Sequence, residues 1–247
     1  AGMTMISDMN NDPSLTSNLD GVAGENWNEG YYRTSYNDIS EGVAAATFAR
    51  DGLDADSAAI IIEPSSSSSY IDNIPAQFAK TFVSLGGTVQ RVTTVQSSAT
   101  AARVADALRE VAAGKPEVLF FDVFSDGVRT LLAQQLAAGV NGLENTKLIG
   151  HRKPWNPPYF EDYYILDQLT DLTAKKNTAT GKSFQEVLNA YEAKHGNDTS
   201  WQHLNSMTYD ATTLLLSAIE ASSTKDGSGN LVIERVGVRE HMLKVSG

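Results

Sequence analysis

The sequence predicts an α/β protein with a doubly wound parallel sheet, together with a second part that is mostly helical. The first observation is a set of continuous apolar runs, such as residues 58–62 and 118–121, which are typical of strands covered on both faces. The second is that helical segments of about 10 to 15 residues separate these runs, and this alternation favours parallel strands with right-handed crossovers. The third is a change after Gly150, where helices follow one another with almost no strands.

Local signals place the individual elements along the chain. Strands are expected at residues 4–7, 58–62, 88–95, 118–121 and 147–150. Helices are expected at residues 39–50, 71–85, 100–113, 126–138, 183–195, 204–222 and 236–244. Asp38 is placed to cap the first of these helices and Gly52 to end it. Residues 31–150 are therefore expected to form one doubly wound α/β layer.

The C-terminal part reads differently. Residues 151–158 contain three prolines and a tryptophan, and this composition excludes regular structure there. Residues 225–230 are expected to form a loop because they combine glycine, serine, aspartate and asparagine. The helix at residues 204–222 has an apolar face that includes Leu214 and Leu215, so it needs a partner surface.

Composition limits the class of protein. A chain of 247 residues is long enough to bury a sizeable core. The net charge is −11 and no basic segment is concentrated enough to follow a phosphate backbone, which argues against nucleic acid as a partner. The absence of cysteine excludes disulfides, Cys-ligated zinc and a thiol nucleophile. No apolar run approaches the roughly 20 residues that cross a bilayer, and the N-terminal residues lack the segments of a signal peptide.

Motifs for enzymatic chemistry are missing from the sequence. Gly181-Lys182-Ser183 imitates the end of a phosphate-binding loop, but Lys176 stands where that loop needs its first glycine. The nucleophile elbow G-x-S-x-G and the Gly-rich dinucleotide fingerprint are both absent. The four histidines do not have the spacing of metal ligands. We therefore expect no enzyme, no cofactor and no metal.

Several short motifs occur in an informative order. In the N-terminal half they are Met5-Ile6-Ser7, Pro13-Ser14-Leu15-Thr16, Tyr32-Arg33-Thr34, Asp38 followed by Gly42, and Ile60-Ile61-Ile62-Glu63 followed by Tyr70. Later in the chain they are Gly86-Gly87-Thr88-Val89, Leu148-Ile149-Gly150, Phe184 with Tyr191, His195-Gly196, and Tyr209-Asp210-Ala211. In this order and spacing the chain resembles the type I periplasmic solute-binding proteins, the leucine/isoleucine/valine-binding group of ABC transporter substrate-binding proteins.

This resemblance implies one lobe of a type I periplasmic binding protein plus an incomplete, mostly helical remnant of the other lobe. Residues 1–30 correspond to a strand and loop of the first lobe, residues 31–150 to a complete second α/β lobe, and residues 151–247 to the hinge and the helical part of the first lobe. Members of the family have a longer N-terminal part, which carries most of the first lobe's sheet. We therefore expect an incomplete chain.

The function implied by the resemblance is that of the substrate-binding component of an ABC transporter. Such a protein captures a small molecule, here an amino acid or a small organic carboxylate, between two lobes by hinge closure. The resemblance also implies a periplasmic or extracellular location, a monomer without a cofactor, and an ABC permease in the membrane as partner. The alternative is the ligand-sensing extracellular domain of a signalling receptor with the same fold, which a transmembrane segment or effector domain in the parent gene would favour.

The resemblance assigns ligand contacts to loops at the carboxyl ends of strands, where open α/β sheets bind ligands generally. Asn10 and Asn11 fall on the first-lobe loop that holds the α-carboxylate in amino-acid binders. The alternative for Asn11 is an asparagine that only forms a turn. Tyr70 matches an aromatic residue that packs on the ligand, and its alternative is a ring that covers the sheet edge.

Four further residues complete the expected site. Phe124 and Ser125 follow the strand at residues 118–121, where amino-acid binders place an aromatic residue; the alternative is a plain strand-to-helix turn. Arg152 stands close to where these binders carry a glutamate for the ligand's ammonium group. An arginine would instead favour a carboxylate, which it can hold with two parallel hydrogen bonds, unless it belongs to a solvated basic loop. Trp155 either lines the pocket or packs at the hinge.

Overall fold

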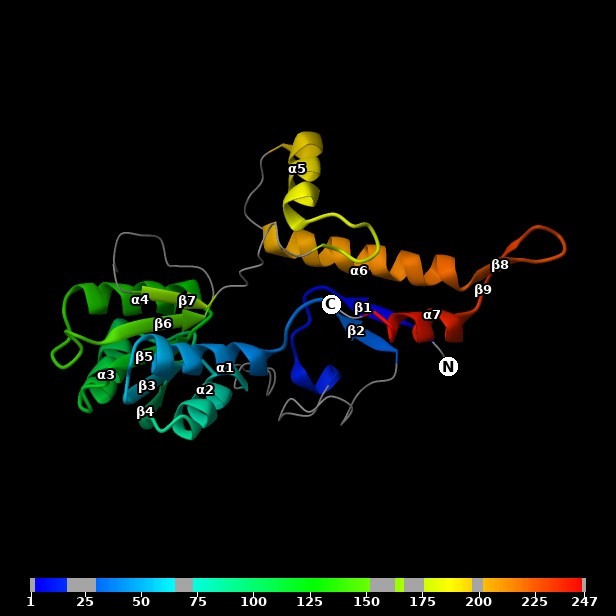
Figure 1. The fold of residues 1–247 in the computed structure, drawn as a ribbon. Coiled ribbons are helices and arrows are strands. Elements are labelled where there is room, and N and C mark those ends of the chain that lie inside the picture. Colours follow the sequence, from blue (N-terminus) through cyan, green and yellow to red (C-terminus); the bar gives the residue numbers. More distant parts are fainter. Residues whose placement is uncertain are drawn as a thin grey trace. The chain divides into compact units, whose positions relative to one another are not determined.

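The computed structural model describes residues 3–16, 30–64, 73–151, 163–166, 176–196 and 202–245 (Figure 1). The chain divides into two compact units. One consists of Asp38–Asp167 and is called the sheet unit below. The other combines Ala1–Asn37 with Gln168–Gly247 and is called the terminal unit, since it contains both ends of the sequence.

The sheet unit is built on a five-stranded sheet in the order β4-β3-β5-β6-β7, and every pair of neighbouring strands is parallel. Its strands are β3 (Ser57–Ile62), β4 (Thr88–Thr94), β5 (Val118–Asp122), β6 (Lys147–His151) and β7 (Tyr163–Leu166). All five residues of β5 are buried, as expected for a central strand covered on both faces. The parallel sheet predicted from the apolar runs is therefore confirmed.

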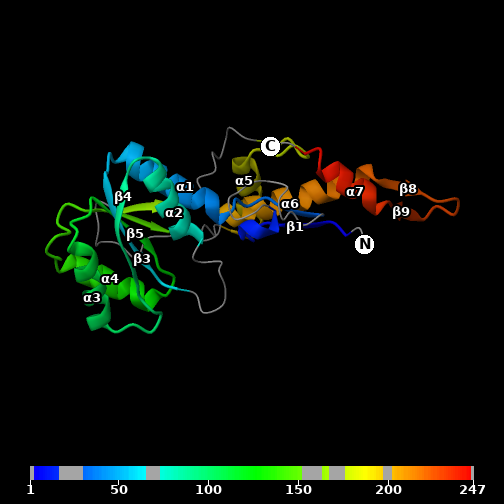
Figure 2. The same ribbon diagram turned by 90° about the horizontal axis from the view of Figure 1, so that it is seen from below.

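Helices cover both faces of this sheet, with α1 and α2 on one side and α3 and α4 on the other (Figure 2). The helices are α1 (Asp38–Thr47), α2 (Asn73–Ser84), α3 (Ala101–Ala112) and α4 (Asp126–Ala137), and a π-helical turn η2 (Phe48–Gly52) continues α1. On the first side Phe78 of α2 stacks on Phe120 of β5 with ring centroids 4.5 Å apart. On the second side Phe121 packs with Leu108 and Leu132. Adjacent residues of one strand thus serve two cores, which defines the doubly wound layer.

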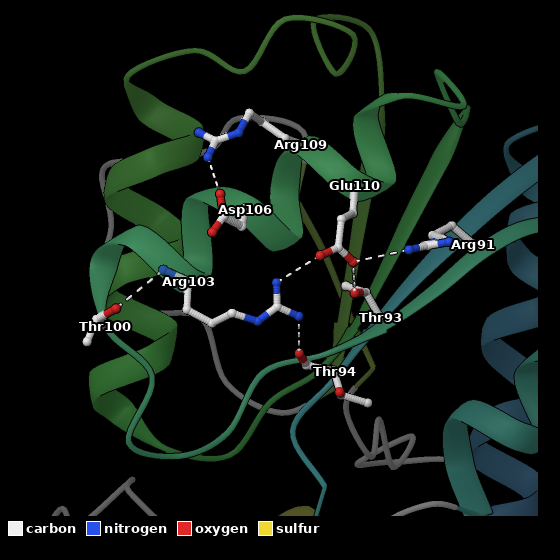
Figure 3. Close-up of polar contacts among 8 residues, drawn as sticks. All are labelled: Arg91, Thr93, Thr94, Thr100, Arg103, Asp106, Arg109 and Glu110. Carbon is white, nitrogen blue, oxygen red and sulfur yellow. Dashed lines mark hydrogen bonds and ion pairs between the residues drawn. The ribbon is translucent and has the colours of Figure 1, made fainter.

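A polar network joins α3 to the edge strand β4 (Figure 3). The Glu110 carboxylate accepts hydrogen bonds from the Thr93 hydroxyl and from the Arg103 guanidinium, the latter at 2.9 Å, and Arg91 approaches it to 3.4 Å. Arg103 also donates to the Thr94 carbonyl at 2.9 Å. The hydrogen bond from Thr93, followed by those from the two arginines, lowers the pKa of Glu110. Because β4 is an edge strand, these charged groups also protect it against pairing with another chain.

The terminal unit is mostly helical in its described part. It contains the strands β1 (Met5–Ser7), β2 (Tyr31–Arg33), β8 (Ser223–Lys225) and β9 (Leu231–Ile233), and the helices η1 (Pro13–Leu15), α5 (Phe184–His195), α6 (Gln202–Ala221) and α7 (Arg235–Met242). Parallel β1 and β2 contribute Ile6 and Tyr32 to a cluster with α6 and α7, which is centred on Ala218, Val238 and Met242. The partner surface that the apolar face of α6 requires is therefore supplied by these elements.

Four expectations at the level of elements need correction, and the first concerns β2 (Tyr31–Arg33), a strand that the sequence did not predict. Asp38 is the first residue of α1 and not the residue before it, a difference within the usual uncertainty of helix ends. A further strand, β7, follows the segment after Gly150 and pairs with β6, so the sheet has one strand more than its apolar runs predicted. The hairpin of β8 and β9 was also not expected, since its strands have only three residues each.

The compact units also differ in extent from the expected layer at residues 31–150. Tyr31–Arg33 forms β2, which pairs with β1 and therefore belongs to the terminal unit. At the other end the sheet unit continues to Asp167 because β7 completes the sheet. The assignment of the two units to two lobes of a binding protein stays a prediction.

Candidate ligand-binding site

The parallel strands of the sheet unit all end at the same side of the sheet, which is called the carboxyl edge below. Glu63 follows β3 there, and residues 123–125 connect β5 to α4. The backbone N–H of Glu63 donates to the Asp122 carbonyl at 2.8 Å, so the pairing of the two central strands reaches their last residues. This is the place where open α/β sheets bind ligands, and two of the expected contact residues, Phe124 and Ser125, lie on it.

A single carboxylate oxygen holds the loop after β5. Oε2 of Glu63 accepts hydrogen bonds from the Phe124 N–H at 2.9 Å, the Ser125 N–H at 2.8 Å and the Ser125 hydroxyl at 2.9 Å. Glu63 itself is buried, with 7% of its surface exposed. A buried carboxylate needs hydrogen bonds to offset its loss of hydration, and the loop supplies three of them.

Arg129 also holds this loop. Its Nη2 donates to the Phe124 carbonyl at 2.7 Å and to the Asp126 carboxylate at 2.6 Å. The peptide groups on both sides of Phe124 are thus fixed by one acid and one base. Sequence reasoning missed Glu63 and Arg129 as site residues; the available signal was an acidic residue directly after a buried strand.

The start of α4 departs from the usual capping pattern for this reason. Ser125 is the N-cap residue, but its side chain makes no capping hydrogen bond to the helix. A serine at this position normally accepts a hydrogen bond from the first turn. Here the hydroxyl instead donates to Glu63, the residue that follows β3. The local capping preference of this serine thus gives way to a contact with a residue that is distant in the sequence.

Tyr163 and Gly150 shape the neighbouring strands β6 and β7. A Cβ atom built on Gly150 would lie 1.6 Å from the Tyr163 hydroxyl, so only glycine leaves room for this ring. Burial raises the pKa of the Tyr163 phenol to about 12, while the positive charge of Arg129 acts in the opposite direction. The phenol therefore stays neutral at physiological pH.

The second expected contact loop follows β1 in the terminal unit. The Ser7 hydroxyl accepts a hydrogen bond from the Asn10 N–H at 3.0 Å. The Asn10 carbonyl accepts from Arg33 Nη1 and from the Ser35 hydroxyl, both at 3.2 Å. Asn10 is exposed, whereas Asn11 is buried with 7% of its surface exposed. The loop is therefore fixed by residues around β2, among them the arginine of the Tyr32-Arg33-Thr34 motif.

The structure thus brings the expected residues together in pairs. Phe124 and Ser125 share one loop, and Asn10 and Asn11 share the other. The remaining ones, Tyr70, Arg152 and Trp155, lie outside the described residues, so their roles remain predictions.

Two cavities lie elsewhere in the described residues. A cavity of about 590 Å³ in the sheet unit is lined by the C-terminal ends of α3 and α4 and by residues that follow them, such as Gly139, so it lies at the opposite edge of the sheet. A smaller one of about 290 Å³ lies in the terminal unit beside His241. Neither contains an expected contact residue. Within the described segments, no cluster of three or more His, Cys, Asp or Glu side chains could hold a metal ion, and no helix combines the length and apolar character needed to cross a membrane.

Comparison with known proteins identifies the fold. No protein-family model and no curated protein matches the sequence. Among solved structures, a leucine-binding protein from Thermotoga maritima superposes with a TM-score of 0.63 at 20% identity, covering 97% of this chain and 61% of that protein. A solute-binding protein of an ABC transporter from R. palustris, in complex with benzoate, gives a TM-score of 0.59 at 19% identity. The match covers 89% of this chain and 56% of that protein.

A third relative is a branched-chain amino acid transporter substrate-binding protein from Streptococcus pneumoniae in complex with isoleucine. It gives a TM-score of 0.60 at 15% identity, covering 98% of this chain and 62% of that protein. The chain therefore spans between 56% and 62% of the length of these three relatives. At these identities the similarity establishes the fold, which is that of type I periplasmic binding proteins. The α/β fold class and the resemblance read from the sequence motifs are confirmed at this level.

Proposed function

We propose that this chain belongs to the extracytoplasmic substrate-binding component of an ABC transporter, which captures an amino acid or a small organic carboxylate. The observation that carries this proposal is the loop holding Phe124 and Ser125, which Glu63 and Arg129 fix at the carboxyl edge of a parallel sheet. The solved structures that share this fold include proteins named for solute binding, with isoleucine or benzoate bound.

The proposed mechanism is hinge closure. The sheet unit acts as one lobe, and the terminal unit supplies part of the other. The ligand binds first to one lobe and contacts both only in the closed form, so it shifts the population towards closure. The closed form then docks on a membrane permease. Support for this mechanism comes from the division of the chain into two compact units.

The proposed contacts divide the ligand into a polar head and an apolar body. Arg152 holds a carboxylate by two parallel hydrogen bonds, a geometry that guanidinium groups favour. Tyr70, Trp155 and Phe124 pack against the apolar body. Asn10 and Asn11 contribute polar contacts from the terminal unit. Isoleucine and benzoate share a carboxylate, and only isoleucine carries an ammonium group, so the two probes separate the two ligand classes.

The test is a titration of the 247-residue chain followed by amide NMR, with L-isoleucine and benzoate as probes up to millimolar concentration. We expect the signals of Phe124 and Ser125 to shift with at least one probe. Arg152→Ala should weaken benzoate binding about tenfold or more, the value of a lost charged hydrogen-bonded pair. The control is Arg91→Ala, which removes an exposed arginine on the edge strand and should leave binding unchanged. Amino-acid binding that is insensitive to Arg152→Ala would end the carboxylate role, and signals that do not respond to any probe would refute binding at this loop.

A further inference from the structure

We propose that Glu63 is a positioning residue that occupies the hydrogen-bond donors of Phe124 and Ser125. The Ser125 hydroxyl can then contact a ligand only as a hydrogen-bond acceptor. The ligand group in contact with Ser125 is then an N–H or O–H donor, such as an ammonium or a hydroxyl. This inference rests on the proposed function and adds to it the chemical character of one part of the ligand.

The argument begins with the donors of the loop. The backbone N–H groups of Phe124 and Ser125 and the Ser125 hydroxyl all point at Oε2 of Glu63, at 2.8 to 2.9 Å. Oε2 is the acceptor in both backbone bonds, and the Ser125 hydroxyl is the donor in the third. All three donors of these two residues are then in use.

The donors of the loop are in use, but one of its acceptors is not. The Phe124 carbonyl accepts a hydrogen bond from Arg129. The hydroxyl oxygen of Ser125, in contrast, keeps its lone pairs, and the residue is only half-buried. A carboxylate placed against this oxygen would meet a second acceptor and no hydrogen. The N–H groups of the first turn of α4 lie beyond Ser125 and favour an anion, so the inference concerns the serine itself and needs a test that isolates it.

A second glutamate in the same unit provides the control. Oε2 of Glu117 accepts from the Asp56 N–H at 2.7 Å, the Ser57 N–H at 2.9 Å and the Ser57 hydroxyl at 3.1 Å. This is the same set of donors, but Glu117 is exposed and lies before β5, at the opposite edge of the sheet. The two glutamates therefore perform the same local task at the two ends of the central strands, and only Glu63 does so at the candidate site.

The first measurement is hydrogen exchange of individual amides in the 247-residue chain. In Glu63→Ala we expect the amides of Phe124 and Ser125 to exchange about tenfold faster, as for a lost hydrogen bond to a charged acceptor. Glu63→Gln should fall between wild type and Glu63→Ala, because its amide oxygen can occupy the same place. Glu117→Ala should accelerate the exchange of the Ser57 amide and leave the exchange of the Phe124 amide unchanged. Unchanged exchange at Phe124 and Ser125 in Glu63→Ala would overturn the inference.

The second measurement compares two probes that differ in one donor group. L-leucine and 4-methylpentanoate share a carbon skeleton and a carboxylate, and only leucine has an ammonium; 4-hydroxybenzoate and benzoate form a second pair that differs in a hydroxyl. In at least one pair, Ser125→Ala should weaken the donor-bearing probe about fivefold or more and leave its partner unchanged, as for one lost hydrogen bond. The control Glu117→Ala should leave the binding of both probes of each pair unchanged.

An equal loss for both members of each pair in Ser125→Ala would overturn the acceptor role. The exchange measurement does not depend on a ligand, so it separates this inference from the proposed function. If Phe124 and Ser125 depend on Glu63 but no probe binds, the positioning role stands and the proposed function fails.

Discussion

Replacing Gly150 by alanine should destabilise the sheet unit through a collision with one ring. The new Cβ would lie 1.6 Å from the Tyr163 hydroxyl oxygen, 2.5 Å from Cζ and 2.9 Å from Cε2. The ring must therefore move by roughly 2 Å to reach an ordinary contact of about 3.5 Å. Overpacking of this kind costs about 1–3 kcal/mol, and the gain from replacing a strand glycine offsets about 0.5–1 kcal/mol of it.

A double-mutant cycle isolates this collision. In the background of Tyr163→Ala the obstacle is gone, so Gly150→Ala should be neutral or stabilising by about 0.5–1 kcal/mol. The difference between the two backgrounds gives a coupling free energy of about 2 kcal/mol. Because two units need not unfold together, urea unfolding should be followed through amide signals of β5 and β6. An equal cost of Gly150→Ala in both backgrounds would refute the reasoning.

The Tyr163 phenol provides an independent readout. Burial raises its pKa from 10.0 to about 12 in the wild type, so displacement of the ring into water in Gly150→Ala should return the pKa towards 10. The raised pKa also means that the folded state favours the neutral phenol. This part of the stability is complete below pH 10 and is lost as the pH rises towards 12. An NMR titration of carbon-13-labelled tyrosine in both variants measures the shift.

Two more substitutions test the packing and the electrostatics of the sheet unit. Gly42→Ala would place a Cβ atom 2.6 Å from the Ile74 carbonyl oxygen and should cost about 1–3 kcal/mol in urea unfolding. The matched control Gly127→Ala, which meets nothing within 4 Å, should stabilise its helix by about 0.5–1 kcal/mol; equal effects of the two would contradict the packing argument. Thr93→Val should raise the lowered pKa of Glu110 towards its usual 4.5, as measured by NMR titration of the side chain. In the wild type the contribution of Glu110 to stability is present above pH 4.5 and is lost as the pH falls through the lowered pKa, and an unchanged pKa in Thr93→Val would contradict the role of this hydroxyl.

The sequence predicted the parts of the sheet unit whose signals are local. The runs that became β3 and β5 are continuous, apolar and short, and they are bounded by polar residues, so their length favours a buried strand. Strand β7 could not be recognised in the same way. It has four residues, of which none is fully buried, and its place is set by pairing with β6. The hairpin of β8 and β9 is shorter still, and its strand residues are mostly exposed.

The candidate site was predictable only in part, for a related reason. Phe124 and Ser125 could be located because they follow a strand that the sequence marks clearly. Glu63 could not be assigned a role, because its partners lie 61 and 62 positions further along the chain. Contacts of this kind depend on which strands become neighbours. The alternation of strands and helices predicts that the strands are parallel, and it leaves their order in the sheet open.

The order of the strands explains why one acid can organise this loop. Strand β3 lies directly beside β5, and their last residues, Ile62 and Asp122, face each other in register. A residue one position past β3 is therefore within reach of the turn that leaves β5, whatever its side chain. A glutamate at this point can accept from backbone N–H groups that an aliphatic residue would leave without a partner. The same logic holds at the opposite edge, where Glu117 precedes β5 and reaches the residues before β3. The pairing of the central strands thus creates two equivalent positions for an acid, and only the one at the carboxyl edge lies at the candidate site.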